Sequence, residues 1–303
     1  MNSYKSDEIL LSAIVPITLM AGRLNLLKQW TAIAENKPIE ILLIHDIADE
    51  ETGRELKEIL AATDNKKIIL IEGEFGSPGL ARNTGIEKAT GNWITFWDSD
   101  DKPELETVLK ILQKKYHTGE LDVIIGQFNV FVIDNGRISP NVSRTRNLVD
   151  ISLNPGLWRM IFRRDVIKDT YFQSFRMAED QNFLSTINLP TLNYKILDNI
   201  FYTYYTGTSS QLTAQQSSIN EIFQAAKFTL GRIANSNKTN RKFNCILFSR
   251  QIITGLKKGS WIIKFNCLGL FLFSFFLSGS VVSRSIVGSV FTIIINQKNR
   301  KLT

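Results

Sequence analysis

Two kinds of hydrophobic pattern alternate over the first 134 residues, and this alternation restricts the fold more than any other feature. Short apolar runs that end at a proline or a polar pair are typical of buried strands. Between them lie stretches with apolar residues at helical spacing, some of which begin with acids or proline. We expect strands at residues 10–17, 39–46, 66–72, 92–98 and 121–134, and helices at residues 22–36, 49–62, 77–91 and 103–119. Repeated strand–helix–strand units with short connections predict the α/β class, with a mostly parallel sheet flanked by helices.

The middle of the chain is less regular. A strand leading into a turn or short helix is expected at residues 155–167, a helix at 178–188 and a further strand at 195–207. Beyond these, residues 217–236 and 241–259 have the spacing of helices, and the second of them is basic and amphipathic.

Charge is divided unevenly along the 303 residues, whose formal net charge is +7. After Glu221, the last 82 residues contain 13 Lys and Arg but no Asp or Glu. The front part therefore holds 23 basic and all 29 acidic residues, for a net charge of −6. An acidic front and a strongly basic rear are expected to face different partners.

The segment FWDSDD, residues 96–101, places three carboxylates at the end of an expected strand. Carboxylates this close repel and raise one another's pKa, so a positive group is expected between them. Hard divalent cations such as Mg²⁺ and Mn²⁺ prefer oxygen ligands of this kind. The alternative is a solvated turn in which Asp and Ser cap the next helix. Asp46 also ends an expected strand, so Asp46 and Asp98 should lie at the same edge of a parallel sheet.

The segment PGLARNTGIEKATGNWITFWDSDD, residues 78–101, resembles the middle of family 2 glycosyltransferases, which are nucleotide-sugar enzymes with a GT-A fold. The shared elements are a Gly, then Ala-Arg-Asn-x-Gly, then Ala-x-Gly, then a strand ending in Asp-Ser-Asp-Asp. The resemblance covers roughly residues 9–210. It implies a GT-A, Rossmann-like catalytic domain over residues 1–215, followed by a basic helical region over residues 216–303.

Carried over position by position, the resemblance implies a donor site. Asp46 would contact the nucleobase, Arg82 and Asn83 would line the nucleotide pocket, and Asp98 would contact the ribose or diphosphate. Asp100 would hold Mn²⁺ or Mg²⁺, with Asp98 and Asp101 as alternative ligands. The favoured donor is a UDP-sugar.

Two positions depart from the family pattern. The family has Pro-x-Tyr-Asn after the first strand, whereas Pro16 is followed here by Ile17-Thr18-Leu19, so the aromatic contact to the base is missing or is supplied elsewhere. The family has Asp-Asp after the second strand, where this chain has His45-Asp46. We assign no catalytic role to His45.

Glu179-Asp180 matches a later acidic pair of the family, whose Asp is the usual catalytic base. Asp180 is therefore the expected base of an inverting transfer to a hydroxyl group, and Glu179 is the reserve. Acids in the first turn of a helix are also favoured by the helix dipole alone, which is the structural alternative. The resemblance suggests synthesis of a bacterial cell-surface polysaccharide. A metal-dependent nucleotidyltransferase and a non-catalytic scaffold are the alternatives; Ala-Arg-Asn-x-Gly argues against the first and the intact acids argue against the second.

The rear is the most hydrophobic part of the chain. From Phe265 to Ser283 there is no charged residue for 19 positions, and a second apolar run covers residues 285–297. Three interpretations compete: a single spanning helix, a pair of helices lying on or partly in an anionic membrane surface, and a buried helical hairpin or protein contact. The lack of acids favours a membrane. The surface state through residues 241–303 is preferred because the second run is too short to span.

The expected location is the cytoplasmic face of a bacterial inner membrane, next to a glycan or lipid-linked glycan acceptor. The N-terminal residues lack the pattern of a signal peptide, and Cys245 and Cys267 match no disulfide framework or metal spacing, which fits a reducing compartment. Nucleic acid is not an expected partner, because the rear aromatics sit in unbroken apolar runs rather than among Lys and Arg.

Overall fold

The computed structural model describes residues 9–63, 65–115, 120–133, 137–140, 144–206, 216–277 and 279–301. By its internal contacts the chain forms two compact units. Unit 1 comprises residues 1–141, 157–169 and 193–207, and unit 2 comprises residues 142–156, 170–192 and 208–303. Two segments from before the predicted domain boundary at residue 215 thus belong to the same unit as the C-terminal helices.

Unit 1 contains the whole sheet. Its strands are β1 Leu11–Ile17, β2 Ile39–Asp46, β3 Ile68–Gly73, β4 Trp93–Phe96, β5 Lys102–Pro103, β6 Val123–Val132, β7 Arg137–Pro140, β8 Met160–Arg163 and β9 Tyr194–Thr206. Its helices are α1 Asn25–Ile33, α2 Glu50–Ala61, α3 Pro78–Lys88, α4 Leu105–Lys115 and α6 Arg164–Ile167, with a short 3₁₀ turn, η2, at Leu157–Arg159. The last residues of the helix expected at 103–119 lie outside the described residues.

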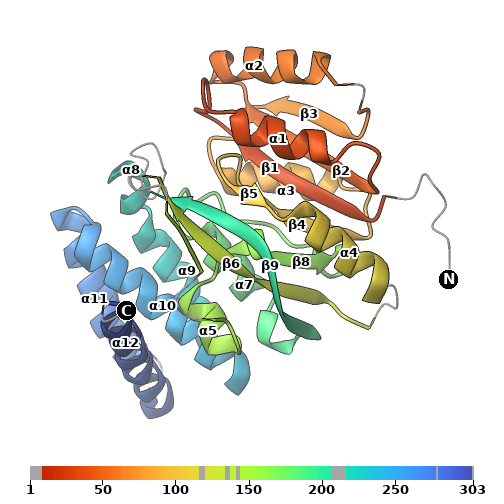
Figure 1. Ribbon diagram of the computed structural model, residues 1–303. Coiled ribbons are helices and arrows are strands. Elements are labelled where there is room, and N and C mark those ends of the chain that lie inside the picture. The colour runs from red at the N-terminus through yellow and green to blue at the C-terminus, as the bar shows by residue number, and fades with distance from the viewer. Residues whose placement is uncertain are drawn as a thin grey trace. The chain divides into compact units, whose positions relative to one another are not determined.

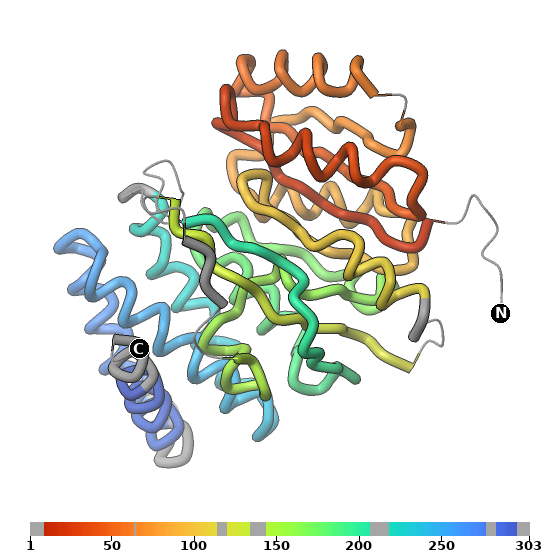
Figure 2. The backbone as a smooth tube through the Cα atoms, in the orientation of Figure 1, coloured from red at the N-terminus to blue at the C-terminus, as the bar shows by residue number. Residues whose placement is uncertain are grey.

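The strand order is β3-β2-β1-β4-β8-β6-β9-β5, and β7 pairs with β6 (Figure 1). The strands β3, β2, β1 and β4 are parallel, as the alternating pattern predicted. Beyond β4 the sheet is mixed, because β8 runs antiparallel to both of its neighbours while β6 and β9 are parallel. Figure 2 shows how β8 returns to lie beside β4 although the two are far apart in the chain. The expected α/β fold is confirmed, and only its first half is an all-parallel sheet.

Two glycines of the family-like segment allow α3 and its following turn to approach β1 closely. A Cβ atom on Gly85 would lie 2.3 Å from Ile14 Cγ2, and one on Gly91 would lie 2.7 Å from Ser12 Oγ. Ser77 caps α3 by accepting a hydrogen bond from Leu80 N–H, and Pro78 occupies the first turn. The positions of Gly85 and Gly91 in the family-like segment are therefore explained partly by the close packing of α3 and its following turn against β1.

The buried carboxylate of Glu40 connects the turn after α3 to the first strands of the sheet. Glu40, on β2, is 4% exposed. It accepts hydrogen bonds from the Ser12 hydroxyl at 2.5 Å and from Thr90 N–H at 2.6 Å. The Ser12 hydroxyl in turn accepts from Gly91 N–H at 2.8 Å. These bonds tie the turn before β4 to the first two strands.

Unit 2 is helical. It contains α5 Leu148–Leu153, α7 Glu179–Thr186, η3 Leu189–Thr191, α8 Gln216–Asn220, α9 Ile222–Ala234, α10 Lys238–Lys258, α11 Trp261–Leu277 and α12 Gly279–Lys301. The α10 helix packs against α9, α11 and α12, and Cys245, Phe248 and Cys267 are buried in their shared core. The helix α12 continues through Arg284, where the sequence suggested a division between two apolar runs. Within the parts of the chain described above, no helix is both long and apolar enough to cross a membrane.

Candidate functional site

The acidic turn after β4 is held from two sides. Arg82, on α3 and only 7% exposed, donates a hydrogen bond from Nη2 to Asp98 Oδ1 at 3.0 Å. The backbone N–H of Asp98 donates to the Tyr202 hydroxyl at 3.0 Å, and Asp101 Oδ1 accepts from Tyr205 N–H at 2.7 Å. The predicted residues Arg82, Asp98 and Asp101 thus form one connected cluster, with β9 as its second support.

Electrostatic strain is concentrated at this turn. Burial, and next the neighbouring Asp98 carboxylate, raise the pKa of Asp100 to about 6. Burial, together with the neighbouring carboxylates of Asp98 and Asp100, raises the pKa of Asp101 well above its ordinary value. Burial also raises the pKa of the Tyr202 hydroxyl, with Asp101 and Asp98 adding to the effect. The repulsion between these carboxylates is therefore only partly offset by Arg82 beside Asp98 and by the charge of Arg23 acting on Asp100.

A divalent cation fits the chemistry of this turn. Among the described residues, no group of three or more His, Cys, Asp or Glu is arranged to enclose a metal ion. Magnesium and similar ions are often held by one or two carboxylates together with substrate phosphates, which requires no such enclosure. Asp100 is half-buried and repelled by Asp98, so a cation there relieves the repulsion. Asp101 is 1% exposed and its Oδ1 already serves Tyr205, so it is placed to support β9.

Asp46 ends β2, which is separated from β4 in the sheet only by β1. Because β2 and β4 both run parallel to β1, Asp46 and Asp98 lie at the same edge, as the sequence predicted. Asp46 Oδ2 accepts from Gly76 N–H at 2.8 Å, and Gly76 has a φ of 64°, which favours glycine. Asn83 follows Arg82 on α3, and Pro16 lies near the end of β1; both are half-buried.

The loop after β1, where the family's aromatic residue is missing, is fixed by the start of α2. Leu19 N–H donates to Asp49 Oδ2 at 2.5 Å, Met20 N–H to the Thr52 hydroxyl at 2.9 Å, and Gly22 N–H to Glu55 Oε1 at 2.7 Å. Leu19 has a φ of 54°, a left-handed conformation that is uncommon for this residue type, and its side chain is exposed. These bonds hold the loop in a fixed conformation beside the Asp46 end of the edge.

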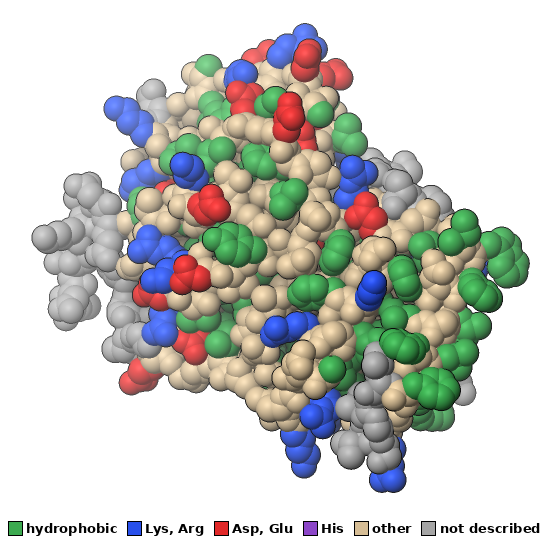
Figure 3. All heavy atoms as spheres, turned by 180° about the vertical axis from the view of Figure 1, so that it is seen from behind, with side chains coloured by type: hydrophobic (Ala, Val, Ile, Leu, Met, Phe, Trp, Pro, Cys, Tyr) green, Lys and Arg blue, Asp and Glu red, His purple; other side chains and the backbone are tan. Residues whose placement is uncertain are grey.

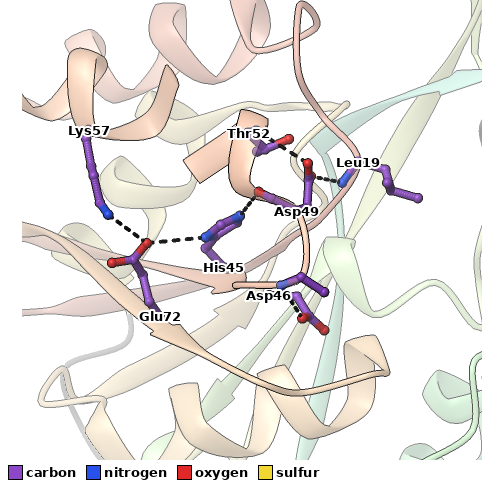
Figure 4. A network of polar contacts seen from close by, with 8 residues as sticks. Leu19, His45, Asp46, Asp49, Thr52, Lys57 and Glu72 are labelled. Carbon is purple, nitrogen blue, oxygen red and sulfur yellow. Dashed lines mark hydrogen bonds and ion pairs between the residues drawn. The ribbon is translucent and has the colours of Figure 1, made fainter. Parts of the chain in front are cut away.

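His45 is buried against the start of α2 rather than exposed on the surface (Figure 4). Its Nε2 is 2.9 Å from the backbone oxygen of Asp49, and its Nδ1 is 3.6 Å from Glu72 Oε1. A Cβ on Gly53 would lie 2.8 Å from His45 Cε1, so the glycine makes room for the ring. Burial alone raises the pKa of Asp49, but hydrogen bonds from Thr52 and Leu19 and the nearby His45 outweigh it and lower that pKa.

Sequence reasoning missed the supporting role of Asp49 and of the tyrosines on β9. Asp49 could have been found, because an Asp directly before a helical pattern whose first turn is acidic is an N-cap signal. The roles of Tyr202 and Tyr205 could not have been found, because the pattern of a strand does not show which distant residues the strand will contact. Here those residues, Asp98 and Asp101, lie about a hundred positions earlier in the chain.

Glu179 and Asp180 belong to unit 2, whereas the other predicted site residues belong to unit 1. They open α7, directly after Ala178, which has a φ of 64° and is buried against Ile222 and Ala225. A left-handed backbone at a non-glycine residue costs energy and is often found at functional sites. Asp180 Oδ1 accepts from Gln181 N–H at 2.7 Å, and both acids are half-buried.

A buried polar contact anchors α7 within unit 2. Asn182 Oδ1 accepts hydrogen bonds from the Thr229 hydroxyl on α9 at 2.9 Å and from Gln251 Nε2 on α10 at 3.1 Å. All three side chains are buried. The first turn of α7, with its two acids, is therefore carried by a helix that α9 and α10 hold in place.

Comparison with known proteins places these residues in context. A family model described as "Glycosyl transferase family 2" matches residues 17–181, a region that contains every predicted site residue except Pro16. Glycosyltransferase GlyA of Streptococcus pneumoniae is 24% identical over 213 residues, covering 64% of this chain and 30% of GlyA. The cholesterol galactosyltransferase of Borreliella burgdorferi is 26% identical over 229 residues, covering 69% of this chain and 62% of that protein. The chain thus spans less than two thirds of the length of either relative.

Among solved structures, S. aureus TarS 1–349 in complex with UDP-GlcNAc matches with a TM-score of 0.64 and 18% sequence identity. The match covers 96% of this chain and 92% of that one. At this level of identity the match is evidence of a common fold.

Proposed function

Because the chain belongs to glycosyltransferase family 2, we propose that it transfers a sugar from a nucleoside diphosphate sugar to a hydroxyl group of an acceptor, with inversion at the anomeric carbon. A UDP-sugar is the proposed donor, a choice supported by the UDP-GlcNAc complex of the similarly folded TarS. The observation that carries the proposal is the Arg82–Asp98 ion pair beside Asp100, within the family-like segment at the carboxyl edge of the parallel strands.

In this proposal the donor lies along that edge. Asp46 contacts the base, Arg82 and Asn83 line the nucleotide pocket, Pro16 flanks it, and Asp98 contacts the ribose or diphosphate. Asp100 would hold Mn²⁺ or Mg²⁺, with Asp98 as a second ligand, and Asp101 supports the turn through Tyr205. When bound, the cation neutralises the charge that develops on the leaving diphosphate. Along the sequence, the proposed catalytic region extends to residue 215, and residues 216–303 form a C-terminal extension.

Asp180 is the proposed general base, with Glu179 as the reserve. An acceptor hydroxyl needs a carboxylate within hydrogen-bond reach as it attacks, on the side opposite the leaving diphosphate. Ala178 fixes the direction in which the first turn of α7 leaves the preceding loop, and Asn182 anchors the rest of that helix. These contacts support a positioned rather than a mobile carboxylate.

The proposed acceptor is a glycan or lipid-linked glycan of a cell-surface polysaccharide, reached at the cytoplasmic face of a membrane. The match to a relative named for galactosyl transfer to cholesterol supports a lipid acceptor, and the basic, apolar C-terminal helices support the location.

Donor binding tests the proposal most directly. Thermal unfolding is recorded with UDP, GDP and CDP, each with and without Mn²⁺. UDP with Mn²⁺ is expected to raise the apparent stability by about 2.7 kcal/mol at a hundred times its Kd. Asp100→Asn should lose most of the gain that depends on Mn²⁺, while Asp169→Asn, an exposed carboxylate elsewhere in unit 1, should keep it.

Measuring sugar transfer and donor hydrolysis distinguishes a glycosyltransferase from a non-catalytic scaffold. Asp180→Asn should keep the UDP-dependent stabilisation and lose sugar transfer and donor hydrolysis. No stabilisation by any nucleotide, and no hydrolysis across a panel of nucleotide sugars, would point instead to a non-catalytic scaffold.

A further inference from the structure

The outward face of α11 is apolar throughout. Its exposed side chains include Trp261 at 85%, Phe265 at 76% and Phe276 at 87% exposure, and Ile262, Leu272 and Phe273 are exposed along the same side. The opposite side carries the buried Cys267 and Ser274 and packs within the core shared with α9 and α10. A helix on the surface of a soluble protein normally turns polar residues outward, so this helix has the reverse arrangement.

The apolar surface continues onto α12 and over a hollow beside α9. On α12, Val287, Phe291, Ile294 and Ile295 are exposed. A hollow lined by Phe223, Phe265, Asn266, Gly269, Leu270 and Phe273 opens between α9 and α11. Figure 3 shows hydrophobic side chains gathered at the edge of the molecule that these C-terminal helices form. Exposed aromatic and aliphatic side chains in this number mark an interaction surface.

The charges around this surface indicate its partner. From residue 222 to the end there is no Asp or Glu, and Lys257 and Lys258 are exposed immediately before α11. Lys264 Nζ lies 5.8 Å from the centre of the Trp261 ring. Lysine stems beside an aromatic ring at the border of an apolar face suit the boundary between lipid tails and anionic headgroups. A second copy of the same basic unit would bring like charges together, which opposes self-association.

We propose that the exposed face of α11, extended by α12, inserts into an anionic lipid surface with the axis of α11 in the plane of that surface. The packing of its other face against α9 and α10 holds the helix flat against unit 2 while its aromatic side chains enter the lipid. This inference deepens the proposed function by naming the residues and the lipid charge that would bring the enzyme to its acceptor. The lipid contact itself is argued from exposure and charge, and only its link to the acceptor rests on the proposed function.

Tryptophan fluorescence of the full chain reports on the contact. Trp30, Trp93 and Trp97 are buried and Trp158 is half-buried, so Trp261 is the tryptophan most exposed to a change of solvent. Vesicles of phosphatidylcholine with phosphatidylglycerol should shift its emission to shorter wavelength, and Trp261→Phe should remove the shift. Pure phosphatidylcholine vesicles should bind more weakly.

Flotation with the same vesicles tests the face itself. Phe265→Glu combined with Phe276→Glu should lower partitioning at least tenfold, because two exposed aromatic side chains can then no longer be buried in the lipid. Lys257→Gln and Lys258→Gln should each lower it about fivefold on the anionic vesicles only. Ile33→Glu, a matched change at an exposed apolar residue of α1, should have no effect.

Two outcomes would overturn the inference: a folded wild-type chain that stays with the aqueous fraction, or concentration-dependent self-association that the two Phe→Glu changes abolish while vesicle binding is absent. The far-ultraviolet circular dichroism and thermal unfolding of each variant show whether it is folded. Neither vesicle assay uses a nucleotide, so loss of donor binding in the thermal assay bears on the proposed function alone.

Discussion

At the scale of single residues, Asp100 links the charge of the site to the stability of the chain. Its pKa of about 6, against an ordinary 3.8, means that the folded state binds its proton more tightly than the unfolded state does. The stabilisation this gives is complete below about pH 4 and is lost as the pH rises through about 6. The loss amounts to about 3 kcal/mol, since each pKa unit is worth about 1.36 kcal/mol.

Asp100→Asn should therefore raise the free energy of unfolding at pH 8 and leave it nearly unchanged at pH 4. Urea unfolding in the presence of EDTA, repeated across this pH range, measures the difference between wild type and variant. The control is Asp169→Asn, whose curve should run parallel to that of the wild type. A constant offset between Asp100→Asn and wild type at every pH would contradict the assigned environment.

The sequence could single out Asp100 and its neighbours as candidate site residues because the pattern that predicts their role lies within one short segment. Spacing within one segment, from Gly79 to Asp101, carries the resemblance, and part of that spacing is now explained by the close approach of Gly85 to Ile14. What the sequence could not show is how the acids differ. The division between Asp100, half-buried, and Asp101, bonded to Tyr205, depends on a strand about a hundred residues further on.

At the scale of elements, the position of α7 depends on the Asn182 contact. Thr229→Val should remove the hydroxyl that donates to Asn182 while keeping the shape of the side chain. We expect a loss of about 1 kcal/mol in unfolding free energy, the usual net contribution of one hydrogen bond, because Asn182 Oδ1 still accepts from Gln251 Nε2. If α7 positions the catalytic base, kcat should fall as well while the Kd for UDP stays unchanged.

The matched control for this change is Thr254→Val. Thr254 bonds only to Arg250 O of its own helix among the contacts described, at 2.8 Å, so it tests the loss of a hydroxyl without a bond between helices. Equal effects of the two changes on kcat would show that the bond between α7 and α9 has no positioning role.

Element prediction succeeded where one segment has one strong pattern. The strand expected at residues 39–46 is β2, because its apolar run is short, rich in isoleucine and interrupted only by Glu40 before its polar end. The two-residue β5 escaped notice, since it is defined only by its pairing with β9. The direction of β8 was likewise beyond the sequence, because an apolar run does not state whether it pairs parallel or antiparallel.

At the scale of the whole molecule, the uneven charge of the chain corresponds to the two proposed binding surfaces. The acidic turn after β4 lies in unit 1, and the apolar face of α11 lies in unit 2. A sequence could suggest this division from the acid-free stretch after Glu221, because charge counts need no knowledge of contacts. It could not suggest that residues 142–156 and 170–192 join the helical unit, since that depends on which surfaces bury one another.

If donor binding and membrane binding use separate surfaces, their energies should add. Asp100→Asn should weaken stabilisation by UDP and Mn²⁺ without changing vesicle partitioning, and the paired changes at Phe265 and Phe276 should do the reverse. The triple variant should show both losses, with a coupling energy within about 0.5 kcal/mol of zero, as for distant and independent sites. Thermal shift and flotation on the four proteins complete the cycle. A coupling well beyond that range would mean that lipid contact changes the donor site, and the enzyme would then be one that its membrane regulates as well as locates.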